Sequence, residues 1–319
     1  MSDFTAVAVD LGAENGRVLA GSIRNGRVVT REVHRFPNVS VRLPDALYWD
    51  VLHIFGEIRE GLRLAASTDE IRSVGVDTWG VDFALLDDRG RLLSNPVHYR
   101  DKRTSRGVDQ VERRLSRADV YAATGIQFMP INTLNQLAAM LEDPLLEAAD
   151  SMLLVPDLFN YWMSGREAAE RTFASTTQMY DPTKREWAWN VIDTMGFPRG
   201  LFQELVDPGE RLEPVLPELA DTIGLNAPVD VVVVASHDTA SAVAAVPAED
   251  EHIAYISSGT WSLVGVELPH PVLTAEARAL NFTNEEGFGG TTRFLKNVMG
   301  LWLLQECRRT WEARSEAHT

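Results

Sequence analysis

The sequence of 319 residues contains a single cysteine, Cys307. One thiol cannot close a disulfide within the chain, and a structural zinc site built from pairs of cysteines is excluded. Targeting signals are also missing. No positive flank precedes an apolar stretch at the N-terminus, and apolar runs such as 231–235 are far too short to span a bilayer. We therefore expect a soluble, cytoplasmic protein with no membrane partner.

Positive charge is the second scarcity. Lys and Arg total 30 against 46 Asp and Glu, which gives a formal net charge of −16. A surface this acidic repels phosphate backbones and anionic lipids, so nucleic acid is not expected as a partner. An anionic substrate stays compatible, because one basic group can dominate a single cleft. With 45% hydrophobic and 24% charged residues, the composition is that of a folded globular protein.

The familiar motifs of several enzyme classes are absent. The sequence has no GxxxxGK followed by Ser or Thr and no complete GxGxxG, and its first glycine turn, 12–16, leads into a strand pattern where the dinucleotide fold needs a helix. There is no GxSxG, and the consecutive Ser236-His237-Asp238 cannot easily align as nucleophile, base and orienting acid. P-loop, nicotinamide-dependent and serine hydrolase chemistry are therefore disfavoured.

The pattern of apolar residues predicts an alternation of strands and helices. Residues 5–11, 17–23 and 27–36 form a predicted antiparallel meander, with the hairpin signal Asn25-Gly26 before its third strand. Asp50 is expected to cap a helix whose apolar positions are Val51, Leu52, Phe55, Ile58 and Leu62. The other predicted elements are strands at 73–77, 81–87, 151–155 and 229–236, helices at 104–115, 133–141 and 240–246, and a loop-rich middle at 167–225.

A strand–turn–strand plan occurs twice in the chain. Residues 254–266 repeat the arrangement of residues 7–19, which indicates two related domains, expected at 1–246 and 252–319. The last strong element is a predicted helix at 297–311, followed by a polar tail. A copy of the first domain would need far more residues than remain, so the second domain is expected to be incomplete.

The first turn offers a way to hold phosphate without a P-loop. Gly12, Ala13 and Gly16 let backbone N–H groups approach an anion, and Arg17 can add a charge-assisted bond. Asp10, at the end of the preceding strand, can hold a hydrated Mg²⁺. The alternative is an ordinary hairpin with an arginine on its edge.

Two further segments allow a functional and a structural interpretation. The stretch from Asp77 to Phe83, DTWGVDF, has carboxylates beside an aromatic side chain, as sugar sites often do, or it is a turn whose Trp79 and Phe83 are core. The cluster Arg100-Asp101-Lys102-Arg103 is a candidate charged site, or a solvated helix start.

Residues 236–239, Ser-His-Asp-Thr, lie between a predicted buried strand and a helix, where active-site groups of α/β proteins gather. Asp238 could be a general base, with His237 as a polar neighbour. A helix N-terminus makes a carboxylate a weaker base, which is acceptable where a hydroxyl loses its proton late, as in phosphoryl transfer. The alternative is a helix cap formed by Asp238.

Taken together, seven segments resemble the rhamnulokinase branch of the FGGY carbohydrate kinases. They are DLGAENGR, DTWGVDF, YRDKRT, GIQFMPINTL, ASHDTASAV, SSGTWSL and KNVMGLWLLQ, in this order between Ala6 and about Gln305. The resemblance implies an α/β fold of actin-like, hexokinase-type (RNase H-like) duplicated domains around a cleft, which agrees with the repeated strand pair.

The resemblance also implies a reaction and its residues. The reaction is ATP-dependent phosphorylation of L-rhamnulose at its 1-hydroxyl, in L-rhamnose breakdown. Asp238 would accept the proton. Sugar contacts would come from Gly80, His237, Asp238, Thr239 and Asn297, ATP contacts from Ala13, Glu14, Asn15, Gly16, Arg17, Thr260 and Gln305, and Asp10 would organise Mg²⁺.

Two departures from the family pattern lead to expectations. Glu14-Asn15 stands where members often carry two serines, so the Glu14 side chain should face solvent, away from phosphate. Members also continue beyond this C-terminus into a glycine-rich turn that holds adenosine. We therefore expect weak sugar binding, little kinase activity, and association through an uncovered helix face formed by Val298, Leu301, Trp302 and Leu304. A non-catalytic sugar-binding protein and a kinase for another ketose remain alternatives.

Overall fold

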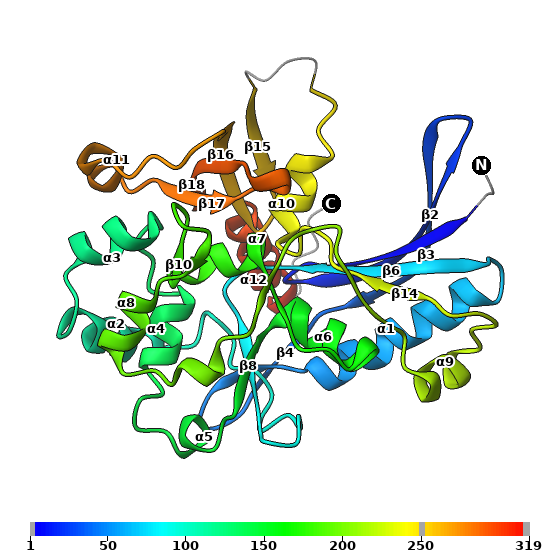
Figure 1. The fold of residues 1–319 in the computed structure, drawn as a ribbon, viewed down its shortest axis with the longest axis horizontal. Helices are drawn as coiled ribbons and strands as arrows, with labels where there is room; N and C mark the ends of the chain where they lie inside the picture. Colours follow the sequence, from blue (N-terminus) through cyan, green and yellow to red (C-terminus); the bar gives the residue numbers. More distant parts are fainter. Residues whose placement is uncertain (1–3, 249–252, 315–319) are drawn as a thin grey trace.

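The computed structural model describes residues 4–248 and 253–314, and the chain forms two units, each built on its own sheet (Figure 1). The first unit has a six-stranded sheet in the order β13-β14-β6-β1-β2-β3. Its strands are β1 (Thr5–Leu11), β2 (Asn15–Arg24), β3 (Arg27–Pro37), β6 (Ile71–Thr78), β13 (Arg211–Pro214) and β14 (Asp230–Val232). The predicted meander is confirmed, with Asn25 and Gly26 at φ of 51° and 74° in its hairpin turn.

The parallel part of this sheet positions the site. Strand β6 lies between β1 and β14 and runs parallel to both, so the carboxyl ends of all three meet at one edge. The predicted strand at 229–236 keeps ladder pairing only over its first part. Its continuation reaches the same edge through the Thr78 N–H, which donates to the Ser236 carbonyl at 2.8 Å.

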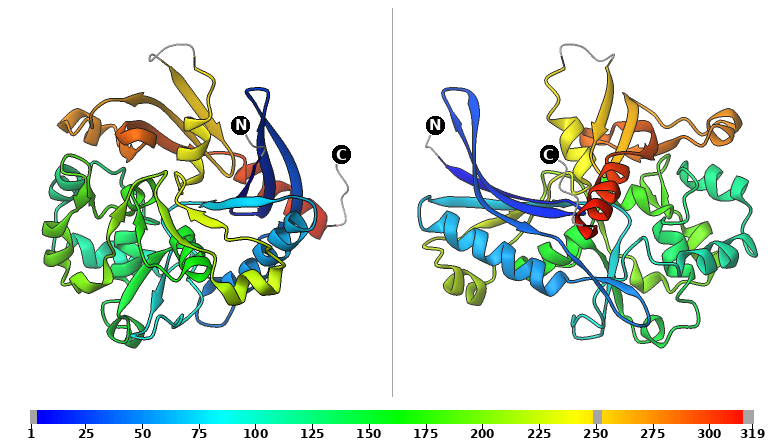
Figure 2. Two further views of the ribbon diagram at one scale, coloured as in Figure 1. Left: turned by 45° about the vertical axis from the view of Figure 1, so that its right-hand side comes forward. Right: turned by 180° about the vertical axis from the view of Figure 1, so that it is seen from behind.

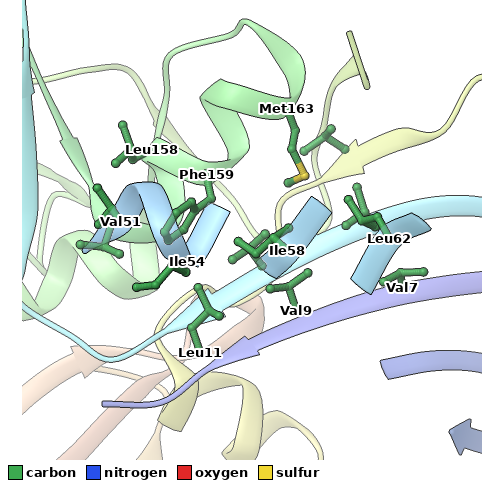
Figure 3. Packing of buried hydrophobic residues seen from close by; sticks show 14 of the residues in the cluster. Val7, Val9, Leu11, Val51, Ile54, Ile58, Leu62, Leu158, Phe159 and Met163 are labelled. Carbon is green, nitrogen blue, oxygen red and sulfur yellow. The ribbon is translucent and has the colours of Figure 1, made fainter. Parts of the chain in front are cut away.

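Helix α1 (Val51–Ala66) covers one face of the sheet, and Asp50 caps it as predicted by accepting a bond from the His53 N–H at 3.1 Å. Figure 3 shows Ile54, Ile58 and Leu62 packed between β1 and helix α6 (Val155–Ser164). The predicted apolar face was wrong at Leu52, which is exposed, and Ile54 takes its place in the core.

In the segment 167–225, expected to be loop-rich, loops join helices and strands of at most seven residues. The first unit outside its large sheet, this segment included, has many short elements, most of them around a second buried core. Its helices are α2 (Thr104–Glu112), α3 (Arg117–Thr124), α4 (Thr133–Ala138), α5 (Pro144–Glu147), α7 (Arg171–Ala174), α8 (Trp189–Met195) and α9 (Pro217–Ile223), with 3₁₀ turns η1 (Ser175–Thr177) and η2 (Arg199–Leu201). Its short strands pair as β4 (Ser40–Arg42) with β5 (Leu47–Trp49), β7 (Phe83–Leu86) with β8 (Ser151–Leu154), β9 (Ala169–Glu170) with β12 (Leu205–Val206), and β10 (Tyr180–Asp181) with β11 (Glu186–Trp187).

Helix α10 (Asp238–Ala244) leads to the second unit, an antiparallel sheet in the order β15-β16-β18-β17. Its elements are β15 (Ala254–Ser258), β16 (Trp261–Leu268), α11 (Ala275–Ala279), β17 (Thr283–Glu286), η3 (Phe288–Gly290), β18 (Thr292–Met299) and α12 (Trp302–Ala313). The repeated strand–turn–strand is present as β15 and β16. The expected start of the second domain, residue 252, lies outside the described residues, as does most of the polar tail.

The predicted helix at 297–311 was wrong at its start. Residues 292–299 form β18 because β16 offers a free edge, which pairs along its whole length from Trp261↔Met299 to Leu268↔Thr292. Helix α12 begins only at Trp302 and reaches Ala313. Of the helix face expected to be uncovered, Val298, Leu301 and Leu304 are exposed, whereas Trp302 packs against Arg100.

The two units are joined by polar contacts along β17. The Asn284 N–H donates to the Gly125 carbonyl at 3.0 Å, and the Glu286 N–H donates to the Ser175 hydroxyl at 2.8 Å. Figure 2 shows α12, in red, running from the second sheet towards the ends of the first strands. Among the residues that the structure describes, no helix has the length and apolar character needed to cross a membrane.

Candidate active site

A cavity of about 450 Å³ lies where the two units meet. It brings together every residue predicted for the site except Gly16. The lining residues from that set are Asp10, Ala13, Glu14, Asn15, Arg17, Gly80, His237, Asp238, Thr239, Thr260, Asn297 and Gln305.

The glycine at position 16 is explained by close packing and not by a contact with the cavity. A Cβ at this position would come within 2.3 Å of the Phe36 ring and 2.9 Å of the Leu11 side chain. The glycine therefore lets β2 pack closely against the core, and its side-chain position does not face the cavity.

The turn from Gly12 to Arg17 is held in a fixed shape. The Gly12 N–H donates to the Asn15 carbonyl at 2.9 Å, and the Asn38 side-chain amide donates to the Gly12 carbonyl at 2.9 Å. Arg17 forms an ion pair with Asp10, its partner in the β1–β2 register. The guanidinium is therefore already at the mouth of the turn, where an anion would meet it.

The side chain of Glu14 meets the expectation of a solvent-facing carboxylate only in part, because it retains 34% of its accessible surface but also borders the cavity. It lines the cavity and forms an ion pair with Arg309 of α12 at 3.3 Å. The carboxylate near the proposed phosphate position is thus balanced by a cation from the second unit, a partner that no local sequence signal announces.

Three carboxylates converge at the sheet edge. Asp10 and Asp77 are neighbours in the β1–β6 register, and Asp238 lies on the same cavity. Burial raises the pKa of Asp77 well above its usual range, and the charges of Asp10 and Asp238 raise it further. A cation here would relieve this repulsion. In the described part of the chain, these carboxylates and the other His, Cys, Asp and Glu side chains form no group of three or more that could hold a metal ion by itself. Mg²⁺ at nucleotide sites, however, commonly takes one or two carboxylates together with phosphates and water.

Asp238 is the first residue of α10, and His237 occupies the N-cap position, so the interpretation of Asp238 as the cap is wrong. The Asp238 carboxylate accepts bonds from the Thr239 N–H at 2.5 Å and the Thr239 hydroxyl at 3.1 Å. Its side chain retains 39% of its accessible surface. The surrounding protein raises the pKa of Asp238, chiefly by desolvation, which favours proton acceptance.

Glu170 anchors the loop before Asp238, a role that no sequence signal predicted. Its buried carboxylate accepts bonds from the Ser236 N–H at 3.0 Å, the Phe173 N–H at 3.0 Å and the Thr172 N–H at 2.7 Å. The Thr172 hydroxyl donates to the same carboxylate at 2.7 Å and lies 3.3 Å from the His237 N–H. Burial raises the pKa of Glu170 to about 7.

Gly80 allows a close approach to the His237 ring. A Cβ at residue 80 would lie 3.2 Å from His237 Nε2 and 3.6 Å from the Thr176 hydroxyl. Because these are the polar atoms that face the cavity here, a larger residue would press against them.

The segment DTWGVDF combines both interpretations. Trp79 lines the cavity and also belongs to the buried core, and Phe83 is core alone. The fully buried Asp82 accepts bonds from the Trp49 indole at 2.6 Å, the Trp79 indole at 2.9 Å and the Gln136 amide at 2.9 Å, so its role is structural. Burial raises the pKa of Asp82 to about 6.

The cluster at 100–103 does lead into a helix, but it is not simply solvated. Asp101 is buried and accepts the Leu47 N–H at 2.9 Å. The Arg100 guanidinium lies 5.1 Å from the Tyr99 ring centre, 5.3 Å from that of Trp261 and 4.8 Å from that of Trp302. Arg100 therefore links the first unit to two aromatic rings of the second.

The second unit supplies the opposite wall, and several of its polar atoms lack partners. The Asn297 N–H donates to the Gln127 side chain at 2.9 Å, which fixes its place on β18. The Thr283 hydroxyl and the Gln305 Oε1 have no hydrogen-bond partner within the protein, and the Glu285 Oε2 has only ion-pair contacts, with Arg293 and His237. Buried orphan polar groups on a cavity wall are suited to a polar ligand.

This geometry agrees with the comparisons to known proteins. The model of the FGGY family of carbohydrate kinases, N-terminal domain, matches residues 5–245, and the model of its C-terminal domain matches residues 254–319. The chain therefore belongs to the FGGY family of carbohydrate kinases, with its actin-like, hexokinase-type fold.

Several similar curated proteins are named rhamnulokinase. Rhamnulokinase from Bacteroides thetaiotaomicron is 45% identical over 95% of this chain and 63% of its own length. Rhamnulokinases from Oceanobacillus iheyensis and Klebsiella pneumoniae strain 342 are 41% and 44% identical. The chain thus spans about 63% of the length of the first of these relatives.

Solved structures show the fold at lower identity. A ligand-bound xylulose kinase from Lactobacillus acidophilus matches with a TM-score of 0.84 at 15% identity, over 96% of this chain and 62% of that one. A Plasmodium falciparum glycerol kinase with ADP matches with a TM-score of 0.78 at 14% identity, over 95% and 64%.

Proposed function

We propose that this chain carries the sugar-binding and phosphate-binding residues of a rhamnulokinase, which transfers the γ-phosphoryl group of ATP to the 1-hydroxyl of L-rhamnulose in L-rhamnose breakdown. The observation that carries the proposal is that Asp238 and the turn at Ala13–Arg17 open into one cavity. Relatives named rhamnulokinase, 39–45% identical to this chain, support the choice of sugar.

Asp238 is the proposed proton acceptor. As the sugar 1-oxygen attacks the γ-phosphorus, its proton passes to the Asp238 carboxylate, and the bond from the γ-phosphorus to the bridging oxygen breaks to release ADP. Gly80, His237, Thr239 and Asn297 are proposed to hold the sugar in reach of that carboxylate. When the sugar displaces water from this cavity, the hydrogen bonds between these residues and the sugar become stronger.

The phosphate side of the cavity has donors from both units. Ala13, Glu14, Asn15 and Arg17 of the first unit line the cavity, as do Thr260 and Gln305 of the second, so backbone N–H groups of the turn and the Arg17 guanidinium are the proposed donors to phosphate. The orphan Oε1 of Gln305 suits an amino or hydroxyl donor of the nucleotide. The Glu14–Arg309 pair neutralises the carboxylate that replaces a small polar residue of the family pattern.

Asp10 is the proposed residue for Mg²⁺, because it shares a crowded acidic edge with Asp77. When bound with ATP, the ion would neutralise phosphate charge. The contribution of the chain is to hold a carboxylate, already oriented by Arg17, beside the phosphate turn.

Sugar binding tests the proposal independently of turnover. Calorimetry of the 319-residue chain with L-rhamnulose should give a measurable affinity, with D-xylulose as the matched control ketose and Asn297→Ala as the matched variant. Equal affinity for both ketoses would favour another substrate, and no binding of L-rhamnulose would contradict the proposal. A coupled ADP-release assay then separates a kinase from a non-catalytic sugar-binding protein.

A further inference from the structure

A buried charged pair of the second unit contacts the ring of His237. Arg293 of β18 is fully buried, and Glu285 of β17 is only 4% exposed. The Arg293 Nη2 lies 3.1 Å from His237 Nδ1 and 3.2 Å from the Glu285 Oε2. The Arg293 Nε also donates to the Glu286 carbonyl at 3.1 Å, which fixes the plane of the guanidinium.

The chemistry of a guanidinium decides the direction of this contact. Arginine has only N–H donors and no acceptor, so the 3.1 Å contact requires His237 Nδ1 to accept. An accepting Nδ1 carries no proton, and the ring proton must then be on Nε2.

The other neutral tautomer of His237, with its proton on Nδ1, is less favourable. A proton on Nδ1 could point to the Glu285 Oε2 at 3.4 Å, but it would also face an Arg293 N–H at the shorter distance. With Nδ1 unprotonated, Arg293 Nη2 can instead donate to His237 Nδ1 while it stays in an ion pair with the Glu285 carboxylate at 3.2 Å. The charges of Arg293 and Glu285 then offset each other inside the protein.

The orientation of the His237 ring places the protonated Nε2 on the side of the cavity. His237 Nε2 faces the close-approach position of Gly80 and lies 3.5 Å from the Asp238 Oδ1. With its proton on Nε2, the ring can only donate towards the cavity, and the Asp238 carboxylate can only accept.

We infer that Arg293 and Glu285 are a positioning pair that fixes His237 as its Nε2–H tautomer, so that His237 donates a hydrogen bond to a sugar oxygen while Asp238 remains the acceptor for the hydroxyl proton. The role in sugar binding rests on the proposed function. The tautomer itself is a property of the free protein.

Nitrogen-15 NMR of the seven histidines in the labelled 319-residue chain reads the tautomer directly, with His237→Gln used to assign the signals. The expected result is a protonated Nε2 and an unprotonated Nδ1 for His237. In Arg293→Met the Glu285 carboxylate becomes the nearest partner of Nδ1, so the proton should move to Nδ1 or a second proton should bind. Arg293→Lys keeps a charged donor and should keep the wild-type pattern.

Glu286→Gln is the matched control, because Glu286 is buried on the same strand but bonds Tyr180 at 2.5 Å and Arg185 at 2.8 Å, away from His237. It should leave the His237 signals unchanged. A proton on Nδ1 in the wild-type chain overturns the inference, and so does an unaltered pattern in a folded Arg293→Met. If that variant does not fold, the wild-type and Arg293→Lys spectra still decide.

Sugar affinity supplies the second readout. Arg293→Met should weaken L-rhamnulose binding by about tenfold or more, as expected for a misdirected hydrogen bond to a polar ligand. Binding that is unchanged although the proton has moved overturns the role in sugar recognition. If the wild-type chain does not bind L-rhamnulose, the proposed function fails, while the tautomer result stands on its own.

Discussion

The anchor residue Glu170 should make the stability of this protein fall as the pH rises through neutrality. Its carboxyl is completely buried, and burial raises its pKa from 4.5 to about 7. The folded state therefore keeps the proton up to about pH 7, whereas the unfolded chain loses it near its ordinary value. Between these two values the folded state binds more protons, so stability from this group is full at low pH and is lost with rising pH.

The expected magnitude follows from the size of the shift. A difference of this size corresponds to about 3 kcal/mol of unfolding free energy lost between pH 5 and pH 8. The Asp157 carboxyl accepts a hydrogen bond from the Glu170 N–H at 3.3 Å. Burial and the Glu170 charge raise the pKa of Asp157 well above its usual range. The two carboxyls titrate as a coupled pair, and both act in the same direction.

Urea denaturation at several pH values, on wild type and Glu170→Gln, isolates this contribution. Glutamine cannot ionise, so the wild-type chain should lose more stability than the variant on going from pH 5 to pH 8, by about the amount above. The exposed Glu213→Gln is the matched control and should follow the wild-type curve. Parallel curves for wild type and Glu170→Gln would refute the reasoning.

Four other changes have defined outcomes. Arg100→Met removes the charge between three rings and should cost about 1–3 kcal/mol in denaturation, whereas an unchanged midpoint would contradict a link between the units. Asp238→Asn should lower whatever ADP release the wild-type chain shows by about two to four orders of magnitude, with little change in sugar affinity, and turnover equal to that of the wild-type chain would exclude Asp238 as the base. Arg17→Ala should weaken ATP binding by about tenfold or more in calorimetry while L-rhamnulose binding is preserved. Gly107→Ala places a Cβ 1.7 Å from the Asn135 carbonyl and should destabilise by about 1–3 kcal/mol or more, against Gly56→Ala as a control with open space.

The local plan of the fold was predictable because its signals are local. A tight hairpin needs a left-handed backbone, which Asn25 and Gly26 adopt readily. Asp50 has a side chain that can cap the first turn of a helix. Asp238 could be proposed for the site because the end of a buried strand is exposed at one sheet edge. None of these interpretations depends on a distant partner.

The errors involve residues whose state is decided by a partner far away in the chain. Asn297 fits a helical period with the residues after it, but the free edge of β16 makes it a strand residue. The ion pair of Glu14 was missed because its cation, Arg309, is 295 positions away. Glu170, Glu285 and Arg293 are charged residues, which usually stay exposed. Their burial is possible because backbone N–H groups donate to Glu170, and because Glu285 and Arg293 form an ion pair with each other.

The two neighbouring residues His237 and Asp238 are held by different units, and this restricts how such a chain can be recombined. Glu170 fixes the loop of Asp238 from within the first unit, whereas Arg293 and Glu285 grip the His237 ring from the second. A chimaera that joins residues 4–248 to the second unit of a relative would keep Glu170, but the contacts to the His237 ring would come from the relative. Productive exchange between family members therefore depends on whether the donor has an arginine and a carboxylate at these two strand positions, more than on the similarity of the surfaces that are joined.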